Sequence, residues 1–151
     1  MRKSVTLKFF IAYFCLIALS LIGIVKCNAQ TIEGYTADFF FAADNLGVVL
    51  NRTAPTIVEQ EGYLFMKRDG IKIPVDAYTS SKYNTIFFDV TSYTYQYNLK
   101  ILVYHEYGHW YLYRDETTKD SIMNTSIWYN TSWDDLTLEM QEYYTKELFQ
   151  K

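Results

Sequence analysis

The sequence predicts an α+β domain in which a small twisted mixed sheet is combined with an N-terminal, a central and a C-terminal helix. Short apolar runs separated by turn residues occur between residues 48 and 90, which is typical of strands. Patterns with helical spacing and capping residues come before them, at 37–46, and after them, at 96–111 and 133–149. No internal repeat or low-complexity tract interrupts this order, so we expect one domain over residues 30–151.

The first 29 residues have the pattern of a secretory signal peptide. A basic start is followed by an almost wholly apolar run from Phe9 to Val25, and Cys27-Asn28-Ala29 provides small residues for cleavage before Gln30. We therefore expect a secreted protein, periplasmic or extracellular. The apolar run has 17 residues, the short limit of a membrane span, so an uncleaved anchor that holds the protein at a membrane is the alternative.

The cysteine content and the charge of residues 30–151 bear on whether a disulfide forms and on whether nucleic acid is a partner. Both cysteines, Cys15 and Cys27, and four of the 14 basic residues lie in the first 29 residues. Residues 30–151 therefore contain no disulfide and have a formal charge of 10 − 17 = −7. An acidic chain without clusters of Lys and Arg has no electrostatic footprint for nucleic acid, so we expect none as a partner. The 122 residues fit one core, and we expect a monomer.

The first helix is predicted from Ala37 to Leu46, with Thr36 as its cap and Gly47 as its stop, and with Phe39, Ala43 and Leu46 packed on a sheet. Val48–Leu50 and Thr56–Val58 are predicted as short strands around a turn with Pro55. Tyr63–Lys67 and Ile71–Ile73 flank Asp69-Gly70, which predicts a hairpin, and Pro74 places its second strand at an edge.

The second half of the domain begins with the strongest strand candidate, Thr85–Val90, which is apolar on both faces and is expected in the centre or near the edge of the sheet. The central helix is predicted from Gln96 to about Tyr111, followed by a polar loop, Asp115–Asn124. Ser132 is predicted to cap a last helix, Trp133–Phe149. Its expected buried stripe is Leu136, Met140, Tyr143, Tyr144 and Leu148.

The central helix contains both histidines of the chain in the pattern His105-Glu106-x-x-His109. A spacing of four places both imidazoles on one helix face, where both can reach one metal ion. Neutral imidazole is a good zinc ligand, and zinc lowers the pKa of bound water to about 7. Glu106, directly after the first histidine, is placed to accept the proton of that water as a general base.

A catalytic zinc needs a third protein ligand. On a continued helix Glu116 would lie about 10 Å beyond His109, so the chain must turn back after His109. A carboxylate of Asp115 or of Glu116 then reaches the metal. Arg114 is a candidate to orient that ligand, or else a solvated surface residue.

The residues His105 to Asp115, HEYGHWYLYRD, are similar to the metzincin zinc motif HExxHxxGxxH/D. Ser121-Ile122-Met123-Asn124 resembles the Met-turn of that clan, at a distance from Asp115 similar to that in matrixins. Ser132–Asp135 at the start of the last helix and Phe87-Phe88-Asp89 upstream also resemble matrixins, so the resemblance extends over about residues 86–149. It departs at Leu112, where metzincins have the glycine at which the chain turns.

The resemblance implies a zincin-like fold and a secreted zinc metalloendopeptidase. It assigns His105, His109 and Asp115 to zinc, Glu106 to general base catalysis, and Met123 to a hydrophobic floor below the metal. Some small bacterial zincins place the last ligand one residue later, which nominates Glu116 as the alternative. The substrate would be an extended peptide laid antiparallel along an edge strand near residues 85–90. No pattern in the sequence supports a calcium site.

Two other functions remain open at this point. A catalytically inactive zinc-binding protein could serve as an exported interaction protein, because its many tyrosines suit an adhesive surface. Intact Glu106 favours the enzyme, since a protein that only binds zinc has no need of a base there. An anchored, aromatic-rich envelope protein without metal would require the HExxH pattern to be accidental.

Overall fold

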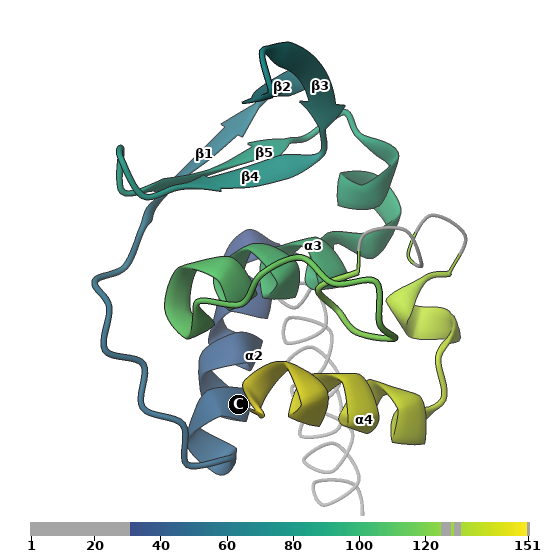
Figure 1. The fold of residues 1–151 in the computed structure, drawn as a ribbon. Coiled ribbons are helices and arrows are strands. Elements are labelled where there is room, and N and C mark those ends of the chain that lie inside the picture. Colours follow the sequence, from purple (N-terminus) through teal and green to yellow (C-terminus); the bar gives the residue numbers. More distant parts are fainter. Residues whose placement is uncertain (1–30, 125–127, 129–130, 151) are drawn as a thin grey trace, which may run out of the picture.

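The structure, a computed structural model, is an α+β fold and describes residues 31–124, 128 and 131–150 (Figure 1). A small sheet lies above helix α3, and helices α2 and α4 lie against the part of α3 away from the sheet. The elements in chain order are α2 (Ile32–Asn45), β1 (Thr56–Gln60), β2 (Leu64–Arg68), β3 (Ile71–Val75), β4 (Ala77–Ser80), β5 (Thr85–Asp89), α3 (Tyr93–Leu112), the 3₁₀ turn η2 (Trp133–Asp135) and α4 (Leu138–Phe149).

The three-stranded sheet has the order β1-β5-β4. β5 is parallel to β1 and antiparallel to β4, and Ile86 and Phe88 of β5 are fully buried. β5 is therefore the central strand of this sheet, which is one of the two positions predicted for residues 85–90. The edge strand on that side is β4, which the sequence analysis did not predict. Its residues Ala77-Tyr78-Thr79-Ser80 alternate too briefly to be recognised as a strand.

The hairpin around Asp69-Gly70 is confirmed as β2 and β3. Both turn residues have positive φ, 52° and 84°, as a two-residue hairpin turn of type I′ requires. The two strands form a sheet of their own, so Pro74 lies on an edge strand as predicted.

Helix α2 begins at Ile32, five residues before the predicted first residue, Ala37. Thr31 is its cap, accepting a hydrogen bond from the Gly34 amide, while the Thr36 hydroxyl bonds to the Tyr107 hydroxyl at 2.9 Å. The predicted packing on a sheet is wrong, because the fully buried Phe39 ring contacts aromatic rings of α3 and α4 instead. Leu46 is exposed, and residues 48–50 do not form a strand.

Helix α3 is longer than predicted and is capped by Ser92. Asn98 leaves the helical conformation within it, and its side chain bonds to the Trp133 amide and to the carbonyls of Trp128 and Thr131. These bonds fasten the segment before α4 to α3.

The last predicted helix is divided into two parts. Ser132 caps the short turn η2, and α4 starts again after Thr137, whose hydroxyl oxygen accepts a hydrogen bond from the Met140 amide as a cap. Because the helix is interrupted at Leu136, the helical periodicity predicted from Trp133 does not continue into α4. The buried face of α4 therefore differs from the predicted one. Tyr144, Leu148 and Phe149 are buried, whereas Met140 and Tyr143 are exposed.

In the described part of the chain, no helix is both long and apolar enough to cross a bilayer. The predicted signal segment, residues 1–29, lies outside the described residues.

Candidate metal centre

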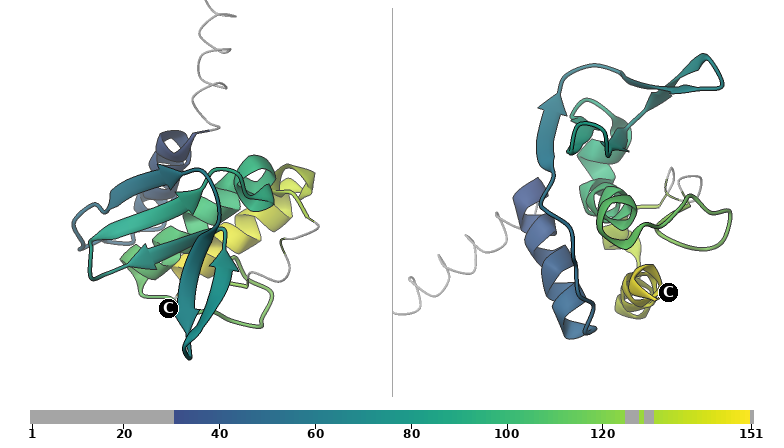
Figure 2. Two further views of the ribbon diagram at one scale, coloured as in Figure 1. Left: turned by 90° about the horizontal axis from the view of Figure 1, so that it is seen from above. Right: turned by 60° about the vertical axis from the view of Figure 1, so that its left-hand side comes forward.

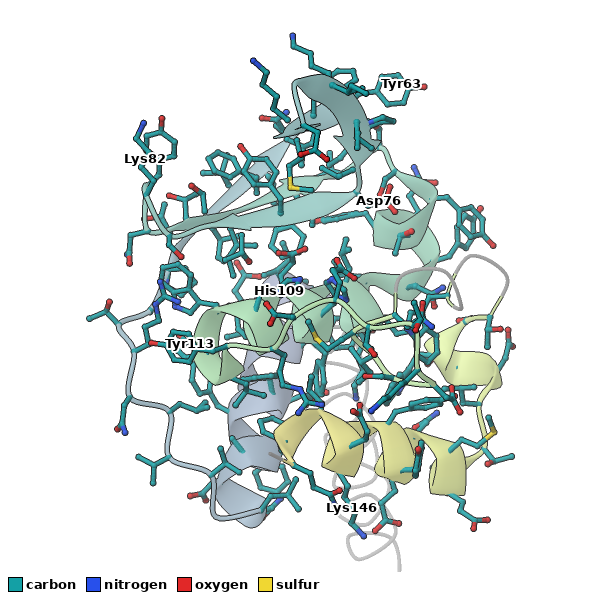
Figure 3. The ribbon with its side chains drawn as sticks, in the orientation of Figure 1. Tyr63, Asp76, Lys82, His109, Tyr113 and Lys146 are labelled. Carbon is teal, nitrogen blue, oxygen red and sulfur yellow. The ribbon has the colours of Figure 1, made fainter. Side chains whose placement is uncertain are left out.

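The two histidines of α3 point toward each other and toward one carboxylate. The Nε2 atoms of His105 and His109 are 3.1 Å apart, and Glu116 Oε1 lies 3.3 Å from the first and 3.7 Å from the second. Figure 3 shows His109 on the side of α3 that faces the sheet. Among the described residues, these three form the one group of His, Cys, Asp or Glu side chains close enough together to hold a metal ion.

The structure brings Glu116, the alternative, to the histidines and leaves the preferred Asp115 outside this group. The reason is where the chain turns. The left-handed residue that ends α3 is Tyr113, with φ 54°, one position after Leu112. Leu112 stays helical, so the turn and the carboxylate that follows it are both displaced by one residue relative to the metzincin pattern.

Backbone carbonyls set the orientation of both rings. His105 Nδ1 donates to the Ile122 carbonyl at 3.0 Å, and His109 Nδ1 donates to the Arg114 carbonyl at 2.6 Å. A carbonyl oxygen only accepts, so each Nδ1 carries the hydrogen and each neutral ring turns the lone pair of Nε2 inward. Two nitrogen lone pairs and a carboxylate oxygen then converge on one point. These electron-rich groups repel one another unless a cation lies between them.

The pKa values of the side chains without a metal also indicate that positive charge is stabilised at this point. Burial alone would lower the pKa of His105, but Glu116, Glu106 and the Ile122 carbonyl favour the protonated ring and raise the pKa overall. When the rings carry a second hydrogen, on Nε2, in place of a metal, their hydrogen bonds lower the pKa of Glu116 to about 2. The point where the three side chains meet thus stabilises a cation.

The separations fit zinc. Ligand atoms about 2.0–2.1 Å from a tetrahedral zinc ion lie about 3.3 Å from one another. The three measured distances are 3.1, 3.3 and 3.7 Å. Two imidazoles and one carboxylate are also a ligand set that zinc uses in catalytic sites, with a fourth position left for water. The residues present therefore fit a catalytic zinc ion.

Glu106 is buried beside this group and is held from the sheet. The Thr79 hydroxyl of the edge strand β4 donates to Glu106 Oε2 at 2.6 Å and lies 3.2 Å from the Glu106 carbonyl oxygen. Burial raises the pKa of Glu106 against the lowering effect of His105 and Thr79. A buried carboxylate with a raised pKa and one fixed oxygen has the properties of a general base. The sequence analysis did not identify Thr79, because β4 was not predicted.

Met123 lies against the helix turn between the two histidines. It is fully buried, and a Cβ atom added at Gly108 would lie 2.6 Å from its sulfur and 3.0 Å from Leu148 Cδ1. The turn that contains it is closed by bonds from the Met123 amide to the Ser121 hydroxyl and from the Asn124 amide to the Ser121 carbonyl. The absence of a side chain at Gly108 is therefore what allows this turn to pack against α3 between the two histidines.

Gly108→Ala is expected to destabilise the protein, although alanine is the better helix former by about 1 kcal/mol. The added methyl group would be too close to the ends of the Met123 and Leu148 side chains, both of which are fully buried, so these side chains would have to shift within the core. Overpacking of this kind costs about 1–3 kcal/mol, which lowers the melting temperature by several degrees. Thermal unfolding measures the change, and shortening the neighbour with Met123→Val should recover part of the loss. An increase in melting temperature would mean that the two residues are not in contact.

Glu147 of α4 connects the two segments whose carbonyls hold the histidines. Its Oε1 accepts a hydrogen bond from Arg114 at 2.7 Å, and its Oε2 accepts one from the Ser121 hydroxyl at 2.6 Å. Arg114 also donates to the Gln150 carbonyl at 2.6 Å. We call this set of contacts the Glu147 bridge. The Arg114 side chain therefore bonds to Glu147 and Gln150 rather than to the candidate ligand Glu116, and it fixes the backbone that bonds His109. No local sequence signal distinguishes Glu147 from the other acidic residues of its helix.

Glu147→Gln is expected to weaken zinc binding by about 10–100-fold, the effect usual for groups that orient metal ligands. Glu142→Gln is the matched control, because Glu142 lies on the same helix and makes only an exposed pair with Lys146. Zinc competition with a chromogenic chelator measures both variants. Equal affinities of the two variants would show that the Glu147 bridge does not orient the ligands.

No protein-family model, curated protein or solved structure matches the chain. The class of protein must therefore be argued from the fold and the site alone: an α+β domain in which a helix with an HExxH pattern meets a carboxylate from the following loop.

Proposed function

We propose that the protein is an exported zinc-dependent endopeptidase with a zincin-like fold, similar to metzincins but with Glu116 in place of their third ligand. The convergence of His105 Nε2, His109 Nε2 and Glu116 Oε1 supports this proposal most directly. These residues would hold the zinc ion, which when bound would polarise the peptide carbonyl and lower the pKa of a water molecule to about 7.

Glu106 would take the proton from the attacking water and pass it to the leaving amine. Thr79 supports this role, because it holds one carboxylate oxygen and leaves the other free to accept a proton. Burying a carboxylate is costly, so a protein that only bound zinc would gain nothing from Glu106 at this position. This favours an enzyme over the zinc-binding interaction protein.

The edge strand β4 would bind the peptide. β4 pairs with β5 on one side, and no described strand pairs with its other side. Main-chain hydrogen bonds along this side would add the substrate to the sheet as a further strand. Because Thr79 of β4 touches Glu106, a peptide bound there would pass beside the base.

Two measurements on the purified protein test the proposal. Metal analysis should find about one zinc ion per chain, and a peptide library should be cleaved by the zinc-loaded protein but not after chelation. Cleavage should return when zinc is added back. A protein that retains no divalent metal, or whose cleavage is insensitive to chelation, would contradict the proposal.

A further inference from the structure

The β2–β3 hairpin projects from the face of the sheet opposite α3. It reaches past the edge strand β4, toward the side where the loop after α3 lies (Figures 1 and 2). β3 is joined to β4 by the single residue Asp76, whose carboxylate accepts a hydrogen bond from Thr94 of α3 at 2.5 Å. The hairpin is thus a continuation of the strand proposed to bind the peptide, and its base is fixed to the helix that carries the histidines.

The two faces of the hairpin differ in chemistry. Strand pairing places Leu64 opposite Val75 and Met66 opposite Ile73, and the side chains of these residues and of Ile71 lie on one face. Leu64 is only 4% exposed, so this face, which we call the inner face, is turned toward the body of the protein at its base. The outer face carries Phe65, Pro74 and the opposed pair Lys67 and Lys72.

The inner face is apolar but remains in contact with solvent farther from the base. Met66 is 41% exposed, Ile73 38% and Ile71 67%. A single exposed apolar side chain is ordinary, whereas several on one face of a projecting element mark an interaction site. On the outer face, the two opposed lysines repel each other weakly and favour contact with water. The outer face thus combines exposed Phe65 and Pro74 with two charges, whereas Met66, Ile71 and Ile73 form an apolar surface on the inner face.

The position of this face relative to β4 indicates which partner it fits. In a peptide added to the β4 edge, successive side chains point to opposite faces of the sheet. One set points toward α3 and the metal group, and the other set points toward the side from which the hairpin projects (Figure 1). The second set would meet the inner face of the hairpin.

We propose that the inner face of the hairpin selects the substrate, by packing against apolar side chains of an extended peptide that point away from the metal group. This inference rests on the proposed function, because it takes the β4 edge as the place where the peptide binds. The tight Asp69-Gly70 turn fixes the two strands in advance, so little ordering is needed on binding. Apolar residues at alternate substrate positions are therefore preferred over polar ones.

Cleavage of a peptide library by three proteins tests this proposal: the wild type, the inner-face variant Met66→Thr/Ile73→Thr, and the outer-face control Phe65→Thr. Threonine keeps the strand propensity at all three positions, and Phe65 is 51% exposed, close to the exposure of the inner residues. The inner-face variant should lose about tenfold in kcat/KM for peptides with leucine at the selected position. It should change less than about twofold for peptides with serine there.

The outer-face control should keep the wild-type preference, and circular dichroism should show that all three proteins are folded. Equal losses for leucine and serine peptides, or equal losses in the two variants, would overturn the proposal. Sedimentation provides a further check, because a wild-type dimer that the inner-face variant converts to monomer would mean that a second copy covers this face.

Peptide binding to Glu106→Gln separates this proposal from the proposed function. If the wild type cleaves no peptide but Glu106→Gln binds leucine peptides through the inner face, the peptidase fails and the selective surface stands. If the wild type cleaves but selectivity does not depend on the inner face, the peptidase stands and the selective surface fails.

Discussion

Glu106→Gln is expected to lower kcat by about 10²–10⁴-fold, the range that general acid–base catalysis contributes. Glutamine has the shape of glutamate and can still accept the hydrogen bond of Thr79, but it cannot take up the proton of the attacking water. Zinc content should be unchanged, because Glu106 is not among the three converging side chains. Single-turnover cleavage of a library-derived peptide, with metal analysis of the same samples, measures both quantities.

Thr79→Val provides a graded comparison for this result. Removing the hydroxyl leaves the base in place but frees its carboxylate to rotate, so kcat should fall less than in Glu106→Gln. Full activity in Glu106→Gln would assign the proton transfer to another group and leave the burial of Glu106 without a catalytic reason.

Glu116→Gln is expected to weaken zinc binding by more than about 10–100-fold, which is the usual effect of changing a residue that only orients metal ligands. The larger effect is expected because the variant removes the charge of the proposed direct ligand. Asp115→Asn, the same change of charge one residue earlier, should alter the affinity by less than about threefold. Chelator competition measures the two affinities under identical conditions. The pair of variants compares the ligand implied by the metzincin resemblance with the one that the geometry favours.

Thermal unfolding gives a second reading of the same comparison. Zinc at 100 times its dissociation constant stabilises a protein by about 2.7 kcal/mol, so the wild type and Asp115→Asn should melt at higher temperature when zinc is added. Glu116→Gln should show little of this increase. If Asp115→Asn lost zinc binding and Glu116→Gln did not, Asp115 would be the third ligand, as the metzincin resemblance implies.

Local patterns were sufficient wherever the structure depends on neighbouring residues. Asp69-Gly70 determines its own turn, and a spacing of four places His105 and His109 on one helix face. The burial of Thr85–Asp89 followed from its apolar character on both faces. These features depend on backbone preferences and periodicity, which a single sequence displays directly.

Features that depend on long-range contacts could not be obtained in this way. Thr79 meets Glu106 across 27 positions of sequence, and Glu147 meets Arg114 across 33. The choice between Asp115 and Glu116 depended on whether Leu112 or Tyr113 takes the left-handed conformation, and neither residue type favours it. In the structure it is Tyr113 that takes this conformation.

The Glu147 bridge also determines when the site can mature during protein synthesis. All three candidate ligands leave the ribosome before α4 does, since Glu147 follows Glu116 by 31 residues. Until α4 docks, the Glu147 side chain cannot join the Arg114 and Ser121 segments, and the backbone bond from the Thr117 amide to the Met123 carbonyl has to hold this loop without it. A nascent chain therefore carries the groups that would bind zinc before all the contacts that orient them are present, so zinc binding should reach its full strength only when α4 has docked.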